Sequence, residues 1–182
     1  MVAMRAKWTL DEYHQMVESG LLSGRHVELV EGDIVEMPPE GPLHAGSAHD
    51  LADYFREIFH GVAIVRDGHP ITLPNHSEPE PDLAIAAPLG ATYRQRHPYP
   101  EDIFLVVEIS RTTLSYDLDA KARLYASARI RDYWVIDLVD RQVWVHRQPA
   151  GDRYQSVEAI ASGSINLVAF PDVEVDVDRL VV

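Results

Sequence analysis

Residues 103–109 constrain the fold most strongly, because they form an apolar run, I-F-L-V-V-E-I, typical of a β-strand that is buried on both faces. Such strands lie in the centre of a sheet. The run nevertheless contains Glu108, and a buried carboxylate without a partner costs several kcal/mol even after the protein relaxes. Glu108 must therefore be protonated, paired with a positive charge or bound to a metal ion.

The rest of the chain predicts an α/β (α+β) protein with a mixed sheet, in one domain over residues 1–182. Helical spacing of apolar residues predicts helices over about residues 9–20, 45–60 and 116–128. Thr9 and Glu12 form a capping box at the start of the first. Alternating apolar residues predict hairpins at 26–37 and 132–147 and strands at 62–66, 70–73 and 82–86, whereas the C-terminal tail alternates only weakly.

The chain has no cysteine, which excludes disulfide scaffolds, zinc ribbons, cysteine nucleophiles and iron–sulfur sites. Glycine-rich nucleotide motifs, a G-x-S-x-G elbow and an H-E-x-x-H pair are also absent. No apolar stretch approaches the length of a membrane span, and the first residues lack an apolar signal core. We therefore expect a cytoplasmic protein that does not bind membranes.

The charge of the chain argues against tight binding of nucleic acid. Sixteen basic and 29 acidic residues give a net charge of −13, which repels polyanions. The exception is the segment 94–131, which contains seven basic and five acidic residues. This region could form a local basic face, although most of these residues are equally well explained as ordinary solvated charges.

Asp82 is a second candidate acid. It follows Pro81 at the head of an apolar strand, and proline is found at strand starts because it lacks an N–H donor. If this strand neighbours residues 103–109, Asp82 and Glu108 share one crevice, where two carboxylates require a cation between them. Oxygen ligands without cysteine favour Mg²⁺ or Mn²⁺ over zinc. His44 and His49, five residues apart, have poor zinc spacing and are expected to be a cap and a surface residue.

Lys121 is one of only two lysines and is the candidate positive charge. Leu118, Ala122 and Tyr125 form an apolar helical stripe, and Lys121 lies on the same inward face. The carboxylate pair could be its counter-charge. Alternatively, its stem packs while its ammonium reaches solvent, or it pairs with Asp117 one turn earlier.

Glu28 lies in the first predicted hairpin, and the sequence pattern predicts a surface position for it. On an alternating strand it shares a face with His26 and Val30, opposite Val27 and Leu29. From this pattern alone Glu28 is weaker evidence for a site than Asp82, Glu108 or Lys121.

Six segments in order, between Leu10 and Arg147, resemble the Uma-type restriction endonuclease family of the PD-(D/E)xK nuclease superfamily. They are R-H-V-E-L-V-E-G-D-I at 25–34, His44, Pro81-Asp82, V-V-E-I-S at 106–110, D-x-x-x-K-x-x-x-Y at Asp117, Lys121 and Tyr125, and Y-W-V-I-D at 133–137. The resemblance implies a restriction-endonuclease-like core, in which helices flank a mixed central sheet, with an N-terminal helix and hairpin and a C-terminal β-hairpin.

The resemblance also assigns site residues. Asp82 and Glu108 match the two acids of the motif, and the main-chain carbonyl of Ile109 would be a further metal ligand. Ser110 stands where the superfamily has its lysine, and Lys121 matches the lysine that Uma-type proteins carry on the next helix. The remaining matches are Glu28, as a third carboxylate that overrides the surface prediction, and His44, Asp117 and Tyr125, without a specified role.

These residues imply a Mg²⁺- or Mn²⁺-dependent endonuclease that hydrolyses DNA by metal-activated water, with Lys121 stabilising the phosphate. Because of the negative charge, DNA binding should be weak and salt-sensitive, and a homodimer could join two basic regions. Two alternatives stay open: a catalytically silent, nuclease-like binding or regulatory module, and a metal-dependent hydrolase of a smaller phosphoester.

Overall fold

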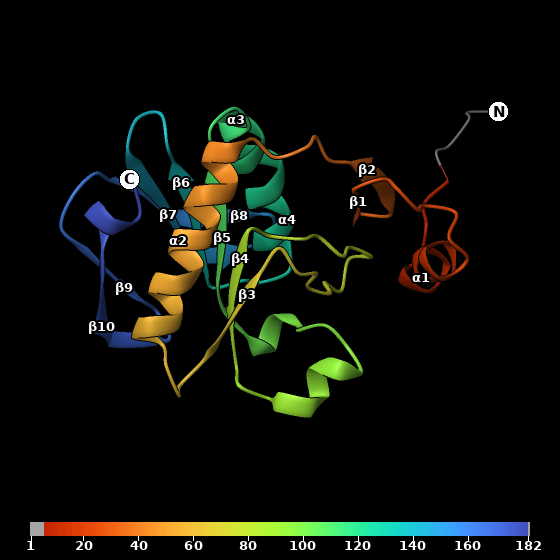
Figure 1. Ribbon diagram of the computed structural model, residues 1–182, viewed down its shortest axis with the longest axis horizontal. Helices are drawn as coiled ribbons and strands as arrows, with labels where there is room; N and C mark the ends of the chain where they lie inside the picture. Colours follow the sequence, from red (N-terminus) through yellow and green to blue (C-terminus); the bar gives the residue numbers. More distant parts are fainter. Residues whose placement is uncertain (1–5, 182) are drawn as a thin grey trace.

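The computed structural model describes residues 6–181 and contains a six-stranded mixed sheet with helices on both faces (Figure 1). The strands lie in the order β3 (Ile64–Asp67), β4 (Leu83–Ala86), β5 (Ile103–Ser110), β6 (Asp132–Asp137), β7 (Gln142–Ala150) and β8 (Arg153–Ile160). All neighbours are antiparallel except the parallel pair β5–β6. The predicted mixed sheet is therefore confirmed, with β5 in its interior.

A helical crossover connects the parallel strands β5 and β6 and covers one face of the sheet. It consists of α3 (Leu114–Tyr116), a π-helical turn (Asp117–Lys121) and α4 (Ala122–Ser127). Leu124 and Tyr125 of α4 belong to the same buried cluster as Val106 of β5 and Tyr133 of β6. The helix predicted over residues 116–128 is present, but the sequence pattern did not predict its π-helical turn.

The opposite face is covered by α2 (Pro42–Ile58) and a small C-terminal hairpin of β9 (Ser164–Leu167) and β10 (Phe170–Asp176), drawn orange and blue in Figure 1. Leu51 and Phe55 of α2 pack in one cluster with Val107 of β5. Both faces of β5 are thus buried, as its composition predicts. None of the helices in the described part of the chain is long and apolar enough to cross a membrane.

The N-terminal elements lie beside the main sheet and dock onto its loops. They are α1 (Leu10–Glu18), which has the predicted capping box, and the hairpin of β1 (Val27–Val30) and β2 (Asp33–Glu36). The two turn residues Glu31 and Gly32 have φ of 48° and 78°, as a tight hairpin turn requires. The Glu78 N–H donates a 2.7 Å hydrogen bond to the Leu29 carbonyl, which joins β1 to the loop that precedes β4.

The strand predicted at residues 70–73 is wrong. These residues form part of an irregular loop, in which Leu73 makes only an isolated bridge with Ser77. The Ile71 and Thr72 N–H groups donate to carbonyls of other loop residues, Pro79 and Pro98. Frequent prolines in this region lack the donors that a continuous ladder needs, so apolar content alone misled the prediction.

His146 makes the stability of the fold depend on pH. It is buried in β7 beside the rings of Tyr133 and Tyr154. Burial lowers the pKa of His146 below its usual 6.5, so near pH 6 the unfolded chain binds protons more readily than the folded protein. The stabilisation that neutral His146 gives to the folded protein is therefore complete above about pH 6.5 and is lost as the pH falls. We expect the urea midpoint to fall more steeply from about pH 7 to pH 5 in the wild type than in His146→Leu; equal slopes would contradict this assignment.

Candidate active site

The antiparallel pairing of β4 with β5 brings Asp82 next to Glu108. Leu83 is opposite Val107, so the residue before β4 lies beside the penultimate residues of β5. Asp82 Oδ2 accepts a 2.6 Å hydrogen bond from the Ile109 N–H, which orients its carboxylate. The strands are therefore neighbours, and both acids lie at the same end of the sheet.

Lys121 lies between two buried carboxylates. Its Nζ is 3.1 Å from Glu28 Oε2 and 3.2 Å from Glu108 Oε1, and its side chain is 2% exposed. The π-helical turn ends at Lys121, and such turns are frequent at functional sites because they re-aim side chains within a helix. In the described chain the ion pairs of Lys121 are with Glu28 and Glu108, so the alternatives of a solvent-exposed ammonium and of an Asp117 pair are not observed.

The surface position that the sequence pattern predicted for Glu28 is wrong. The residue is 1% exposed, because the loop before β4 covers the second face of β1. The Glu80 N–H donates a 3.2 Å hydrogen bond to Glu28 Oε1. An alternating pattern is ambiguous when a loop without regular structure covers the polar face of a strand, and here a buried charge pair occupies that face.

Tyr125 and Asp117 support the cluster from the crossover helix. The Tyr125 hydroxyl donates a 2.6 Å hydrogen bond to Glu108 Oε1. Asp117 is buried and accepts a 2.7 Å hydrogen bond from the Thr113 hydroxyl. Burial raises the pKa of Asp117 above its usual value, an effect that the charge of Lys121 opposes.

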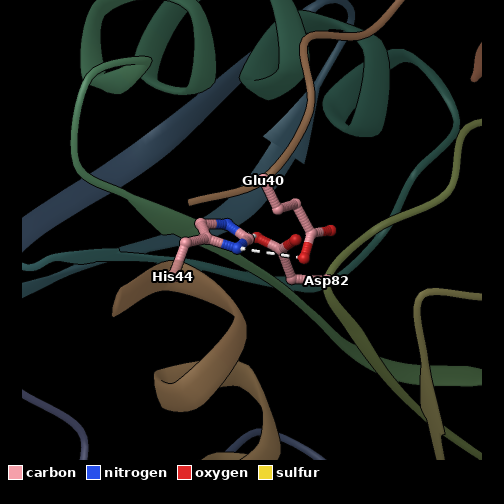
Figure 2. Close-up of side chains that lie close together, drawn as sticks. All are labelled: Glu40, His44 and Asp82. Atoms are coloured by element: carbon pink, nitrogen blue, oxygen red, sulfur yellow. Dashed lines mark hydrogen bonds and ion pairs between the residues drawn. The ribbon is translucent and has the colours of Figure 1, made fainter. Parts of the chain in front are cut away.

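A further group forms on the α2 side, where Glu40, His44 and Asp82 point toward one another (Figure 2). His44 Nε2 lies 3.2 Å from Asp82 Oδ2, and His44 Nδ1 lies 3.7 Å from Glu40 Oε2. The hydrogen bond to Asp82 raises the pKa of His44 to about 9, against the effect of burial. Unlike the cap expected from the sequence, His44 is an ion-pair partner of Asp82.

The charged groups described above line one cavity of about 260 Å³ at the end of β5, and Tyr125 contacts it through Glu108. Its acidic residues outnumber its basic ones, and its walls come from β1, the β2–α2 loop, α2, the segment before β4, β5 and the crossover helix. The charged lining residues include Glu28, Glu40, Asp82, Glu108, Asp117, Arg111 and Lys121. A pocket with a surplus of carboxylates is suited to a bound cation.

Electrostatics support the same interpretation. Burial raises the pKa of Glu108 to about 8, an effect that Lys121 opposes and that nearby Asp82 strengthens. Burial alone would lower the pKa of Lys121, but Glu108 and Glu28 raise it above its usual value, so Lys121 carries its charge at neutral pH. Perturbed pKa values of this kind concentrate at functional sites.

A family model named Uma2, described as "Putative restriction endonuclease", matches residues 10–178. The chain belongs to the Uma2 family. No curated protein matches it. A similar solved structure is that of a "putative nuclease belonging to DUF820" from Anabaena variabilis, with a TM-score of 0.66, 18% identity, and coverage of 94% of this chain and 97% of the other.

The Uma2 match confirms the family expected from the sequence and extends beyond it. The resemblance noted in the sequence ended at Arg147, whereas the family model continues to residue 178 and so includes the β9–β10 hairpin. At 18% identity, the Anabaena structure supports the fold alone. The catalytic roles assigned to Asp82, Glu108, Lys121 and Glu28 remain predictions.

Two residues of this Uma2 site were missed by sequence reasoning. Glu40 lies in a proline-rich loop, where its only signal is its position four residues before His44. Arg111 follows Ser110 at the end of β5 and lines the cavity. Within residues 6–181 it is exposed and has no carboxylate at ion-pair distance, unlike most charges near the site.

Proposed function

We propose that this Uma2 protein is a metal-dependent endonuclease that hydrolyses DNA phosphodiester bonds. The observation that carries the proposal is the convergence of Asp82, Glu108 and Lys121 on one cavity at the end of β5. Two adjacent carboxylates can hold a divalent ion that promotes phosphodiester hydrolysis, and a nearby lysine can stabilise the negative charge that develops on the phosphate. Membership of a family described as restriction endonucleases supports this reaction class.

The residues present fit a divalent ion. Asp82 uses Oδ2 and Glu108 uses Oε1 for their hydrogen bonds in the described chain, which leaves one oxygen of each carboxylate free. Both residues line the cavity, and the adjacent Ile109 carbonyl is a further oxygen donor in our proposal. Oxygen ligands suit Mg²⁺ and Mn²⁺. A bound ion would lower the pKa of a water molecule and neutralise charge on a phosphate oxygen.

The remaining chemistry belongs to the side chains around this ligand set. Lys121 presents a compact positive charge beside Glu108, where it can stabilise the negative charge that develops on the phosphate. Glu28 holds the ammonium from the other side and so positions it. The Tyr125 hydroxyl fixes Glu108 Oε1 and leaves the second oxygen available.

The net charge of −13 predicts weak binding of DNA, so each available arginine matters. Arg111 is the natural phosphate contact, because it is exposed at the cavity. We expect Arg111→Ala to weaken DNA binding at low salt and to reduce the slope of log K against log salt by about one. Fluorescence anisotropy at a series of salt concentrations measures both. A homodimer that joins two such surfaces would strengthen binding further.

Arg131→Ala is the matched control, since Arg131 is also exposed but precedes β6 at the opposite end of the sheet. Its substitution should change affinity less than that of Arg111. Equal effects would show that only net charge matters and would remove Arg111 from the site.

Cleavage is tested with purified protein and supercoiled plasmid at low salt, in Mg²⁺, in Mn²⁺ and in EDTA. We expect nicking with metal only, and its loss in Asp82→Asn, which also excludes a contaminating nuclease. Identical behaviour of wild type and variant would overturn the proposal in favour of a binding module. Hydrolysis of bis(p-nitrophenyl) phosphate without cleavage of DNA would instead indicate a smaller phosphoester as substrate.

A further inference from the structure

We propose that a groove at the other end of the sheet binds a small organic acid with an apolar body. The groove has a volume of about 1060 Å³ and lies where the parallel strands β5 and β6 begin. Ile103 in the groove precedes Glu108 by five residues of extended strand, a distance of about 17 Å. The inference goes beyond the proposed function, because binding here requires neither a metal ion nor DNA.

The lining of the groove is mainly apolar. Leu73, Ile103 and Ala128 line it and are buried, and Phe104 and Val168 extend the apolar surface. The lining comes from segments far apart in the sequence, namely residue 10 and residues 72–74, 99–104, 128–131 and 168–169. Pockets for small molecules have volumes of about 300–1,000 Å³ and apolar walls with a few polar groups. The groove is large enough for a ligand with a substantial apolar body.

Arg129 and Arg131 supply positive charge to this groove. Both line it with exposed side chains, and within residues 6–181 neither side chain makes a hydrogen bond or an ion pair. Arg147, by contrast, pairs with Asp132 at 3.1 Å. Among the described residues of the lining the one acid is Glu101, which lies beyond ion-pair distance of both arginines. In a chain with a net charge of −13, two unpaired guanidinium groups beside an apolar surface favour an anionic ligand.

The backbone of Arg129 is a second, independent observation. Arg129 follows the last turn of α4 in the left-handed conformation, with φ of 62°. Its N–H donates to the Ala126 carbonyl at 2.9 Å, and the Ile130 N–H donates to the Tyr125 carbonyl at 3.0 Å, which are the two hydrogen bonds of a Schellman motif. Glycine is the usual residue at this position, because it has no Cβ to strain the backbone. Strain of this kind is typical of residues whose side chains have a function.

The chemistry of the lining defines the ligand. Arginine binds a carboxylate through two parallel hydrogen bonds and keeps its charge at physiological pH. Arg129 and Arg131 flank the buried Ile130 and both reach the groove, so one carboxylate can contact either or both. The apolar body of the same molecule would cover the apolar lining. A monocarboxylic acid such as decanoate has this form, whereas inorganic phosphate lacks the apolar body and should bind poorly.

Calorimetric titration of the complete chain with decanoate and with decanol tests the site. We expect decanoate to bind at least about 10-fold more tightly than decanol, because hydrogen bonds between charged groups are stronger than those to a neutral hydroxyl. Affinity should also rise about fourfold for each methylene added between octanoate and decanoate, since each buried methylene contributes to binding.

Arg129→Gly separates ligand binding from stability. The variant should unfold at a higher urea concentration than the wild type, because glycine relieves the strain of the positive φ. It should nevertheless bind decanoate about 10-fold more weakly and bind decanol as before. A variant that only damaged the fold would unfold at a lower urea concentration. Arg131→Gln should weaken decanoate binding in the same direction.

Arg141→Gly is the matched control. Arg141 is also exposed and has a positive φ of 52°, but it lies in the β6–β7 turn, away from the groove. This variant should bind decanoate as the wild type does. Failure of the wild type to bind decanoate, equal affinity for decanoate and decanol, or equal weakening in Arg129→Gly and Arg141→Gly would overturn the proposal. Sedimentation with vesicles of anionic lipid, without binding of decanoate, would also overturn it and would indicate a lipid surface as the partner.

Discussion

Replacing Lys121 by methionine is expected to lower the free energy of unfolding by about 3–5 kcal/mol. The methionine side chain has nearly the same length, so packing changes little, but Glu28 and Glu108 lose their common counter-charge. Glu28 is 1% and Glu108 5% exposed, so water cannot compensate. Removing one member of a buried charge cluster is costly, because the others remain buried and uncompensated. Urea denaturation measures the loss.

The other lysine of the chain provides the matched control. Lys7 pairs with Asp33 at 2.8 Å, but its side chain is 51% exposed, so Lys7→Met should cost no more than about 1 kcal/mol. Neutralising both carboxylates in the triple variant Lys121→Met, Glu28→Gln and Glu108→Gln should restore most of the lost stability. If Lys121→Met is as stable as Lys7→Met, the buried cluster does not exist in solution.

Glu108→Gln is expected to reduce metal-dependent cleavage by about 1,000-fold or more, because a metal ion contributes several kcal/mol to the transition state and each 1.36 kcal/mol is tenfold in rate. The fold should survive, since Gln can still accept the hydrogen bond of the Tyr125 hydroxyl. Burial raises the pKa of Glu108 to about 8, so the folded protein already tolerates a neutral group there. Plasmid cleavage and calorimetric titration with Mg²⁺ measure the two effects.

Comparing Glu28→Gln with Glu108→Gln distinguishes a metal ligand from a residue that only pairs with Lys121. Glu28 and Glu108 both contact Lys121, so both variants lose one ion pair. In our proposal Asp82 and Glu108 bind the ion and Glu28 does not. The Glu28→Gln variant should therefore keep the Mg²⁺ affinity of the wild type and lose less cleavage activity than Glu108→Gln. Equal loss of Mg²⁺ binding in the two variants would make Glu28 a third metal-binding carboxylate, contrary to the positioning role proposed here.

The sheet and its faces were largely predictable, because they follow from residue patterns. The apolar run at 103–109 identified a central strand, and the stripe around Lys121 identified the inward face of the crossover helix. Asp82 stood out because it follows a proline at the head of a strand. These predictions rest on burial, which periodicity reports directly.

The parts that were not predictable depend on loops. Glu28 looked exposed because the segment that covers it has no regular structure, and residues 70–73 looked like a strand because only their hydrogen-bond partners reveal a loop. Glu40 joins the site through the path of the β2–α2 loop, which no periodicity encodes. Sequence patterns report which face of an element is buried, but not which loop folds over it.

The long-range contact between Glu28 and Lys121 also bears on when the site can form during synthesis. These residues are 93 positions apart, and the intervening chain includes α2, β4 and β5. Closing a loop of that size costs entropy that only the finished core repays. In a nascent chain that has not yet emerged beyond residue 121, Glu28 and Glu108 have no Lys121 ammonium to pair with. This site can therefore form only after the crossover helix has left the ribosome and folded.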